Sequence, residues 1–173
     1  WALGHHQARW GYGSALAVRS VWQEFAENDL PLSSMHLDID HMQGYRNFTF
    51  GSEHWAGIGD LIAEMAAEGV RTVVIVDAGT AKDDRYQVYR EGVERGLFCT
   101  NSDGSTLEGV VWPGRTVFPD FTSALVRRWW GEQFAFYADL GVADYWHDMN
   151  EPSNFVAWGD PTFPLSTRHD LDG

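Results

Sequence analysis

The sequence predicts an α/β fold in which parallel strands alternate with helices. The run TVVIVD is continuous and β-branched, which is typical of a strand that is covered on both faces. Apolar residues at helical spacing mark three helices that lie between the expected strands. Acidic residues follow three of these strands. Strands that alternate with helices form a right-handed β/α series, and about four such units fit into 173 residues.

The first strand and the first helix are expected near the N-terminus. The segment WALGHHQ is expected to form strand one. Ser14 follows Gly13 and can cap a helix that ends near Asn28. One face of this helix carries the apolar residues Val18, Val21, Trp22 and Phe25.

The second strand and helix come next. SSMHLDID is expected to be a strand that finishes on Asp38 and Asp40. A loop through Arg46 and Phe50 then leads to a helix that stops at Gly69. The buried stripe of this helix is expected to consist of Ile58, Leu61, Ile62 and Met65.

The second half of the chain begins with TVVIVD, which ends on Asp77. A long irregular stretch from about Thr80 to Pro119 is expected to follow, and a loop of this length is usually functional. A third helix is expected over roughly Asp120 to Leu140, and strand four, Asp144 to His147, then delivers Asp148. The buried side of the third helix is expected to carry Phe121, Leu125, Trp129, Phe136 and Leu140.

The acids at the strand ends predict a site. In a (β/α)8 barrel the carboxyl ends of the strands form the active face. Asp38, Asp40, Asp77 and Asp148 would all lie at such ends. Any one of them could simply cap the next turn, but their common position favours a shared function.

Charge and composition exclude several classes of partner. The formal net charge is −13 and the sequence pI is about 4.7, so nucleic acid and anionic membranes are poor partners. The single cysteine, Cys99, excludes an internal disulfide and suits a reducing compartment such as the cytoplasm. The N-terminal segment WALGHHQARW lacks the pattern of a signal peptide, and no window resembles a membrane-spanning helix. We therefore expect a soluble protein.

Both ends of the sequence are expected to be cuts within a longer protein. The chain begins without Met and stops in the polar stretch TRHDLDG. Residues 1–173 would then be one partial domain. Half a barrel leaves strand edges unpaired, so it should belong to a longer chain or form a homo-oligomer.

Five sequence blocks occur in an order that is specific to one enzyme family. They are GHHQARWGY, LDIDHM followed by FTF, IVDAGT, VVWPGRTVFPDF and WHDMNEPSNF. Together they resemble the glycoside hydrolase family 31 α-glucosidases, essentially from end to end. The resemblance implies a (β/α)8 TIM barrel of which this chain is the first half, ending just past strand four. It implies an α-glucoside oligosaccharide or glycoside as substrate, and neither a cofactor nor a metal.

The resemblance also implies roles for the acidic residues. Asp148 matches the nucleophile of a retaining mechanism, in which one carboxylate lies beneath the anomeric carbon and an acid about 5 to 5.5 Å away protonates the leaving oxygen. The acid/base, together with an arginine and a histidine that hold the sugar, lies beyond residue 173, so the chain alone is expected to be inactive. Glu151 is expected to support Asp148 electrostatically rather than to donate a proton. Asp38 matches the aspartate that grips the far hydroxyl of the terminal glucose, with Asp40 behind it.

Five apolar side chains are expected to line the first sugar subsite by the same resemblance. For any single one of them, packing in a core is the default interpretation. The aromatic rings would stack on the C–H groups of the sugar, and the aliphatic side chains would complete the wall. The residues are Ile39, Ile75, Trp112, Trp146 and Met149.

The chain departs from the family pattern at three positions. His41 stands where the family often has Tyr, Gln43 where an Asp often follows the Met, and Ala78 where Pro is usual. These positions affect loop rigidity and substrate preference. The matched nucleophile and the matched sugar-gripping acid are unchanged, so the reaction type is better defined than the preferred linkage.

Rival interpretations come from other classes. A metal-dependent hydrolase is suggested by the clustering of His36, Asp38, Asp40 and His41, although His5 and His6 are adjacent and should point to opposite faces. A second rival is a carbohydrate-binding half barrel that keeps the aromatic groove and has no catalytic activity. Within the family, α-xylosidase, transglycosidase and glucan lyase activities share the same nucleophile position, and Asp38 favours an α-glucoside.

Overall fold

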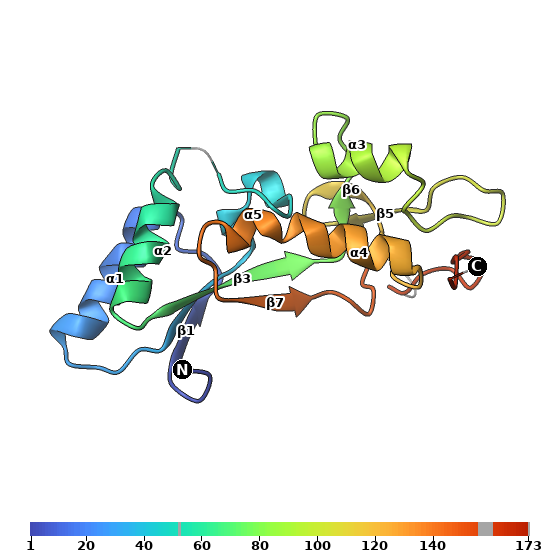
Figure 1. The fold of residues 1–173 in the computed structure, drawn as a ribbon. Coiled ribbons are helices and arrows are strands. Elements are labelled where there is room, and N and C mark those ends of the chain that lie inside the picture. Colours follow the sequence, from blue (N-terminus) through green and yellow to red (C-terminus); the bar gives the residue numbers. More distant parts are fainter. Residues whose placement is uncertain (52, 156–160, 173) are drawn as a thin grey trace. The chain divides into compact units, whose positions relative to one another are not determined.

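Four strands form the main sheet of the computed structural model, in the order β1-β2-β3-β7 (Figure 1). They are β1 (His6–Arg9), β2 (Ser34–Leu37), β3 (Arg71–Asp77) and β7 (Asp144–Asp148). β1 pairs with β2 and β2 with β3, both in parallel. The predicted parallel sheet is thereby confirmed.

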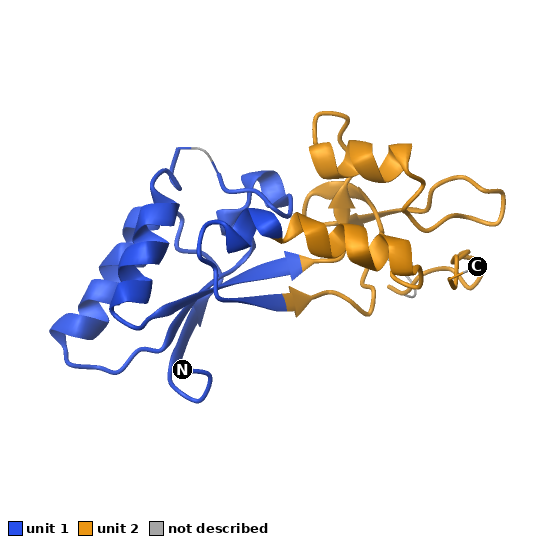
Figure 2. Cartoon of the chain, viewed as in Figure 1, with its two compact units in different colours: residues 1–76, 135–146 blue, residues 77–134, 147–173 orange. Residues whose placement is uncertain are grey.

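The structure describes residues 1–51, 53–155 and 161–172. The chain divides into two compact units, which are coloured separately in Figure 2. Unit 1 consists of Trp1–Val76 and Ala135–Trp146, and unit 2 of Asp77–Phe134 and His147–Gly173. Unit 1 carries nearly all of the parallel sheet.

The first two helices of unit 1 match the prediction. α1 (Ala15–Glu27) begins after Ser14, whose hydroxyl accepts a hydrogen bond from the backbone N–H of Ala17 at 3.1 Å. α2 (Ile58–Ala67) buries its four predicted residues, Ile58, Leu61, Ile62 and Met65. α1 and α2 lie side by side (Figure 1), and Arg19 of α1 forms an ion pair with Glu64 of α2.

Two strand boundaries were predicted wrongly. Strand one begins at His6 rather than at Trp1. Strand two stops at Leu37, and Asp40 lies in a short 3-10 helix, η1 (Ile39–His41), with Asp38 as its N-cap. The carboxylate of Asp38 accepts a hydrogen bond from the backbone N–H of Ile39, so it competes with the sheet for a backbone donor and ends the strand.

The stretch from Thr80 to Pro119 is structured, which corrects the expectation of an irregular loop. It contains α3 (Gln87–Glu94) and a three-stranded antiparallel sheet in the order β4-β6-β5. The strands are β4 (Thr80–Ala81), β5 (Glu108–Val111) and β6 (Gly114–Val117). Trp112 and Pro113 form the turn between β5 and β6. Strands of two to four residues are too short to show a periodic pattern in the sequence.

The third predicted helix is two helices, α4 (Ala124–Gln133) and α5 (Ala135–Ala138). Its predicted apolar face was wrong in part: Trp129 is buried as expected, whereas Phe121, Leu125 and Phe136 are 36%, 49% and 40% exposed. The interruption between the helices breaks the helical phase, so one stripe cannot continue across it. The buried side chains are Val126, Trp129 and Trp130 of α4 and Tyr137 of α5.

Cys99 is a free, buried thiol. Burial, with the nearby Asp120 carboxylate, raises the pKa of this thiol to about 12. Cys99 is therefore protonated at neutral pH. Among the described residues, no helix has both the length and the apolar character that crossing a membrane requires.

Candidate active site

Asp148 is the last residue of β7, so a rigid element positions it. Its Oδ1 accepts a hydrogen bond from the backbone N–H of Met149 at 2.9 Å. Met149 has a φ of 55°, in the left-handed region, so the chain turns sharply directly after the strand. The half-buried carboxylate thus caps this turn at the carboxyl end of a parallel strand, where the nucleophile was predicted.

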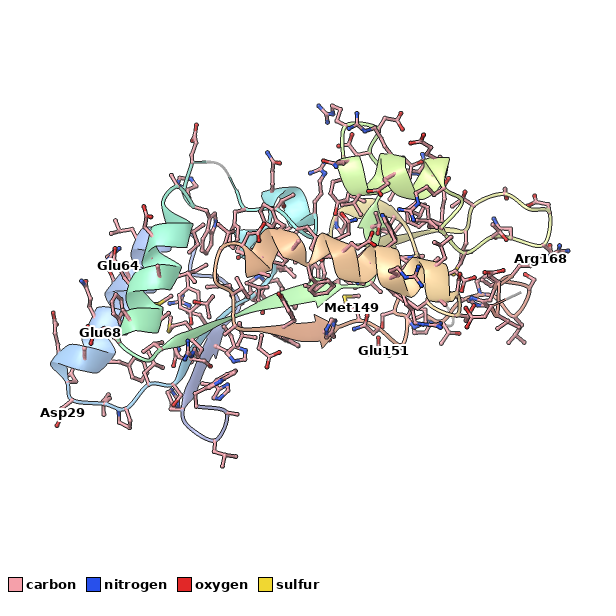
Figure 3. The ribbon with its side chains drawn as sticks, viewed as in Figure 1. Asp29, Glu64, Glu68, Met149, Glu151 and Arg168 are labelled. Atoms are coloured by element: carbon pink, nitrogen blue, oxygen red, sulfur yellow. The ribbon has the colours of Figure 1, made fainter. Side chains whose placement is uncertain are left out.

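Glu151 lies three residues further along in the same loop (Figure 3). Its carboxylate accepts a hydrogen bond from the Ser153 hydroxyl at 2.8 Å. The pKa of Glu151 is lowered by its own backbone N–H and by Ser153. An exposed carboxyl group that is held ionised is suited to electrostatic support and poorly suited to proton donation.

Met149 packs against an apolar cluster of unit 2. The cluster consists of Cys99, Leu107, Val111 and Phe118, with Met149 and Phe163 packed against it. This contact anchors the turn after Asp148 to the interior of unit 2.

The hairpin that carries Trp112 contacts the Asp148 loop through Asn154 and Phe155. The side-chain oxygen of Asn154 accepts from the backbone N–H of Val110, and the backbone N–H of Phe155 donates to the Val110 carbonyl, both at 2.7 Å. The rings of Trp112 and Phe155 meet edge to face, with centroids 4.9 Å apart. Our sequence reasoning missed both contact residues, although Asn154 and Phe155 end the block WHDMNEPSNF.

Gly109 permits this close approach. A Cβ atom at this position would lie 2.8 Å from the Asn154 side-chain oxygen and 2.8 Å from the Phe118 ring. Any larger residue would push the loop away from the hairpin, so the glycine is required by packing.

Asp38 lies in unit 1, directly after β2. Its Oδ1 accepts from the backbone N–H of Ile39 at 2.7 Å, which repeats the capping geometry of Asp148. Asp40 approaches the chain at Gly11, where a Cβ atom would lie 2.0 Å from a carboxylate oxygen of Asp40. Gly11, in the first sequence block, therefore leaves room for the carboxylate of Asp40, in the second block.

The residues of unit 1 that were predicted to line the sugar subsite differ in how exposed they are. Ile39 and Ile75 are 3% and 2% exposed, so they offer little surface to a ligand. Trp146 is half-buried and lines a hollow of about 410 Å³. Its ring lies beside that of His36, with centroids 6.4 Å apart.

His5 and His6 point to opposite faces of the sheet, as predicted. His5 stacks on Phe25 of α1 with ring centroids 5.3 Å apart. His6 instead bonds to His36, with His6 Nδ1 and His36 Nε2 3.0 Å apart. Burial and the neighbouring His6 lower the pKa of His36, although Asp144 opposes this effect.

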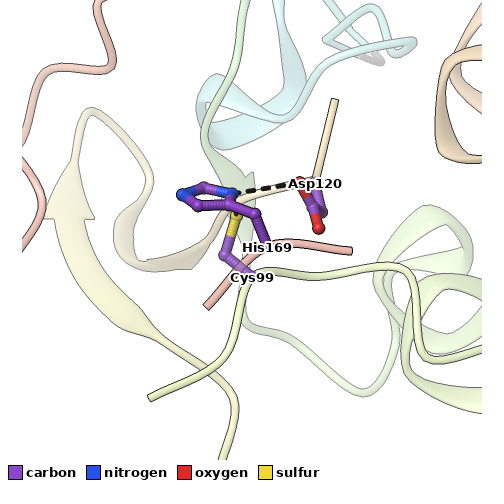
Figure 4. A group of neighbouring side chains, drawn as sticks. All are labelled: Cys99, Asp120 and His169. Carbon is purple, nitrogen blue, oxygen red and sulfur yellow. Dashed lines mark hydrogen bonds and ion pairs between the residues drawn. The ribbon is translucent and has the colours of Figure 1, made fainter. Parts of the chain in front are cut away.

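The predicted alternative of a metal site on His36, Asp38, Asp40 and His41 finds no support among the residues that the structure describes. The one set of three or more potential metal ligands found there is Cys99, Asp120 and His169 in unit 2 (Figure 4). Hydrogen bonds explain why these three side chains lie close together. Asp120 accepts from His169 Nδ1 at 3.0 Å, from the Thr122 hydroxyl and from the backbone N–H of Asp170.

These bonds also set the protonation of Asp120. Burial opposes its ionised form, but hydrogen bonds from Asp170, Thr122 and His169 outweigh burial and lower its pKa. The Asp120 carboxylate already accepts several hydrogen bonds, and the thiol of Cys99 is protonated. The group therefore serves as a structural link between the segment around His169 and the end of the block VVWPGRTVFPDF, to which Asp120 belongs. Asn150 and Pro152 of the Asp148 loop line a neighbouring cavity of about 650 Å³ in the same unit, together with Cys99, Asp120 and His169.

Comparison with known proteins gives one consistent family. Residues 1–172 match the family model described as the glycosyl hydrolases family 31 TIM-barrel domain. The chain is 45% identical over its full length to alpha-glucosidase 2 of Bacillus thermoamyloliquefaciens, of which it covers 22%. It is 42% identical to the lysosomal alpha-glucosidase of Mus musculus over 90% of the chain and 17% of that protein.

A solved structure shows the same arrangement. The DNJ-bound glucosidase II alpha subunit superposes with a TM-score of 0.90 and 30% identity, over 97% of this chain and 18% of the other. The chain thus spans about one fifth of the length of these relatives. Because the family model matches nearly every residue, the chain belongs to glycoside hydrolase family 31, and its four-stranded parallel sheet is part of that family's TIM barrel.

Proposed function

We propose that the protein carrying this chain is a retaining α-glycoside hydrolase that releases terminal α-glucose, with Asp148 as the nucleophile. One observation carries the proposal. In a chain that belongs to family 31, the block WHDMNEPSNF places Asp148 at the carboxyl end of a parallel barrel strand. The alpha-glucosidase names of the relatives support glucose as the sugar.

The chemistry follows from the two-carboxylate mechanism. An oxygen of Asp148 attacks the anomeric carbon while the bond to the leaving oxygen breaks, and an acid from outside residues 1–173 protonates that oxygen. Water, activated by the same acid/base, then attacks the anomeric carbon and releases Asp148. Two inversions leave the product with the α configuration of the substrate. Glu151, an anion in the same loop, supports this site electrostatically.

The other predicted residues have binding roles in this proposal. Asp38 accepts a hydrogen bond from the hydroxyl opposite the anomeric carbon, because a charged acceptor binds a hydroxyl more strongly than a neutral one does. Trp112 and Trp146 supply ring faces for the apolar side of the sugar. Ile39, Ile75 and Met149 are assigned to the apolar wall of the same subsite by the family resemblance. No cofactor takes part.

The test uses Asp148→Ala in the intact protein, with an aryl α-glucoside that has a good leaving group. Turnover should nearly vanish, and added azide should restore part of it by attacking the anomeric carbon in place of the missing carboxylate. Asp139→Ala is the matched control, since Asp139 is exposed and outside the proposed site. Wild-type rates in Asp148→Ala would remove Asp148 from the mechanism, and a product of inverted configuration would exclude retention. Binding of glucosides without turnover by the wild-type protein would instead favour a carbohydrate-binding function.

A further inference from the structure

A buried polar network joins Asp38 to helix α5 within unit 1. The backbone carbonyl of Asp38 lies 2.8 Å from His41 Nδ1 and also accepts the backbone N–H of His41 at 3.1 Å. His41 Nε2 lies 3.2 Å from the Tyr137 hydroxyl. The backbone N–H of Phe48 donates to the same hydroxyl at 3.0 Å. His41 and Tyr137 are each 0% exposed.

The partners determine the direction of every bond. The Asp38 carbonyl can only accept, so Nδ1 of His41 carries the proton and donates it. In the neutral ring Nε2 is then an acceptor, and it receives the Tyr137 O–H. The oxygen of Tyr137 in turn accepts from Phe48. Each polar atom in this chain of bonds is satisfied in one arrangement, which makes the network rigid.

The surrounding rings hold the network in place. His41 contacts Phe50 and Trp55, with ring centroids 4.9 Å and 6.3 Å from its own. Tyr137 lies against Phe48 and Phe50, at 5.7 Å and 5.9 Å. These aromatic residues exclude water, so an unmade hydrogen bond here has no replacement partner.

Asp38 therefore receives support from two sides. Its side chain is oriented by the backbone N–H of Ile39, and its carbonyl is held by the imidazole of His41. A shift of the η1 turn would displace both the carbonyl and the carboxylate, since they belong to one residue.

We propose that His41 and Tyr137 are positioning residues that hold the Asp38 carboxylate in the orientation that binds the terminal sugar. The proposal rests on the function proposed above, in which Asp38 binds the hydroxyl opposite the anomeric carbon. Neither residue touches the sugar. They determine how well Asp38 discriminates a glucoside from the analogue that lacks that hydroxyl.

The experiment measures kcat/KM of the intact protein for an aryl α-glucoside and for its 4-deoxy analogue. In Tyr137→Phe the ratio of the two values should fall about ten-fold, mainly through a higher KM for the full glucoside. Tyr89→Phe is the matched control, because Tyr89 is a buried tyrosine of unit 2. It should leave the ratio unchanged. A lower melting temperature of Tyr137→Phe with an unchanged ratio would overturn the positioning role.

His41 variants provide a second measurement if Tyr137→Phe does not fold. His41→Asn keeps an N–H near the Asp38 carbonyl, so it should retain much of the discrimination. His41→Leu cannot donate and should lose it. Equal ratios in the two variants would contradict the proposal.

Asp38→Asn separates this inference from the proposed function. If Asp38 binds the hydroxyl, Asp38→Asn alone should collapse the ratio, and adding Tyr137→Phe should change it less than about two-fold. Strictly additive effects would show that Tyr137 acts independently of Asp38. An unchanged ratio in Asp38→Asn would instead refute the binding role of Asp38 itself.

Discussion

The turn at Asp38 and the turn at Asp148 share one local geometry and differ in what supports it. In each, a carboxylate at the end of a parallel strand accepts the backbone N–H of the next residue, at 2.7 Å and 2.9 Å. Behind Asp38 lies a buried network through His41 and Tyr137. The Asp148 turn is held by the Met149 contact and by exposed hydrogen bonds of Asn154 and Ser153.

This difference suggests a division of labour. Recognising one hydroxyl among several needs an acceptor that does not move, and a dry, fully satisfied network provides it. In the proposed mechanism the distance between the Asp148 carboxylate and the anomeric carbon shortens as the covalent bond forms and lengthens as it breaks. A turn supported by solvent-accessible bonds can adjust at lower cost.

The largest expected effect is on the chemistry at Asp148. Asp148→Asn keeps the shape of the side chain but removes the charge that the proposed mechanism uses for attack, so kcat should fall on the order of 10⁴-fold. Asp38→Asn should act mainly through KM. Steady-state kinetics of the two variants in the intact protein would measure this contrast. Similar kcat losses in both would remove the distinction between nucleophile and binding acid.

The next effect is the pH dependence of stability that His41 causes. Burial outweighs the bonds to the Asp38 and Leu37 carbonyls and lowers the pKa of His41 to about 4. In the unfolded chain the pKa returns to about 6.5. Between these values the unfolded state takes up a proton and the folded state does not. Stability should therefore fall by about 3 kcal/mol as pH drops from about 6.5 to 4, with no further loss from this group below that.

The check is the slope of the melting temperature against pH in this window. The carboxylates and His36 add their own slopes, so the relevant quantity is the difference between the wild type and His41→Leu. His54→Asn, at an exposed position, is the control and should keep the wild-type slope. Identical slopes in the wild type and His41→Leu would show that His41 is not neutral in the folded protein.

A smaller effect is expected at the hairpin that supports the Asp148 loop. Asn154→Ala removes the acceptor for the Val110 backbone N–H, and because this bond is exposed the free energy of unfolding should fall by at most about 1 kcal/mol. Limited proteolysis should then cleave faster near Glu151. Asn101→Ala is the control, since Asn101 bonds within its own turn to Ser105. Unchanged proteolysis in Asn154→Ala would mean that the hairpin does not restrain the loop.

The smallest effect is expected at Glu151. Ser153→Ala removes one of the hydrogen bonds that keep its carboxylate ionised, so the pKa of Glu151 should rise toward its ordinary value. Because the group is exposed, the melting temperature should not change measurably. Carbon-detected NMR titration of the Glu151 carboxyl would measure the shift. A pKa that stays the same would assign the lowering to the Glu151 backbone alone.

Local signals predicted the elements whose structure depends on neighbouring residues. The Ser14 cap, the four-residue stripe of α2 and the β-branched run of β3 each occur within one turn or one strand, so their patterns are complete in the sequence. The strand-end acids were found for the same reason. The roles assigned to Asp148 and Asp38 came from the resemblance to the family and still await a test.

Elements that depend on distant contacts were not predicted. The strands of the β4-β6-β5 sheet are short, and their pairing stabilises them more than their composition does. The break after Gln133 places Tyr137 in the core and leaves Phe136 exposed. In a segment with aromatic residues on both sides, only packing decides which face is buried.

By itself, the sequence determined the alternation of strands and helices, the family, and the strand ends where acids would lie, because these are encoded by local patterns and by contiguous motifs. Tertiary structure alone decided what holds those acids. His41 and Tyr137 are 96 positions apart, and Val110 and Asn154 are 44 apart. A hydrogen bond over such a separation leaves no periodic trace in the chain, since it forms only after the fold has brought the two groups together.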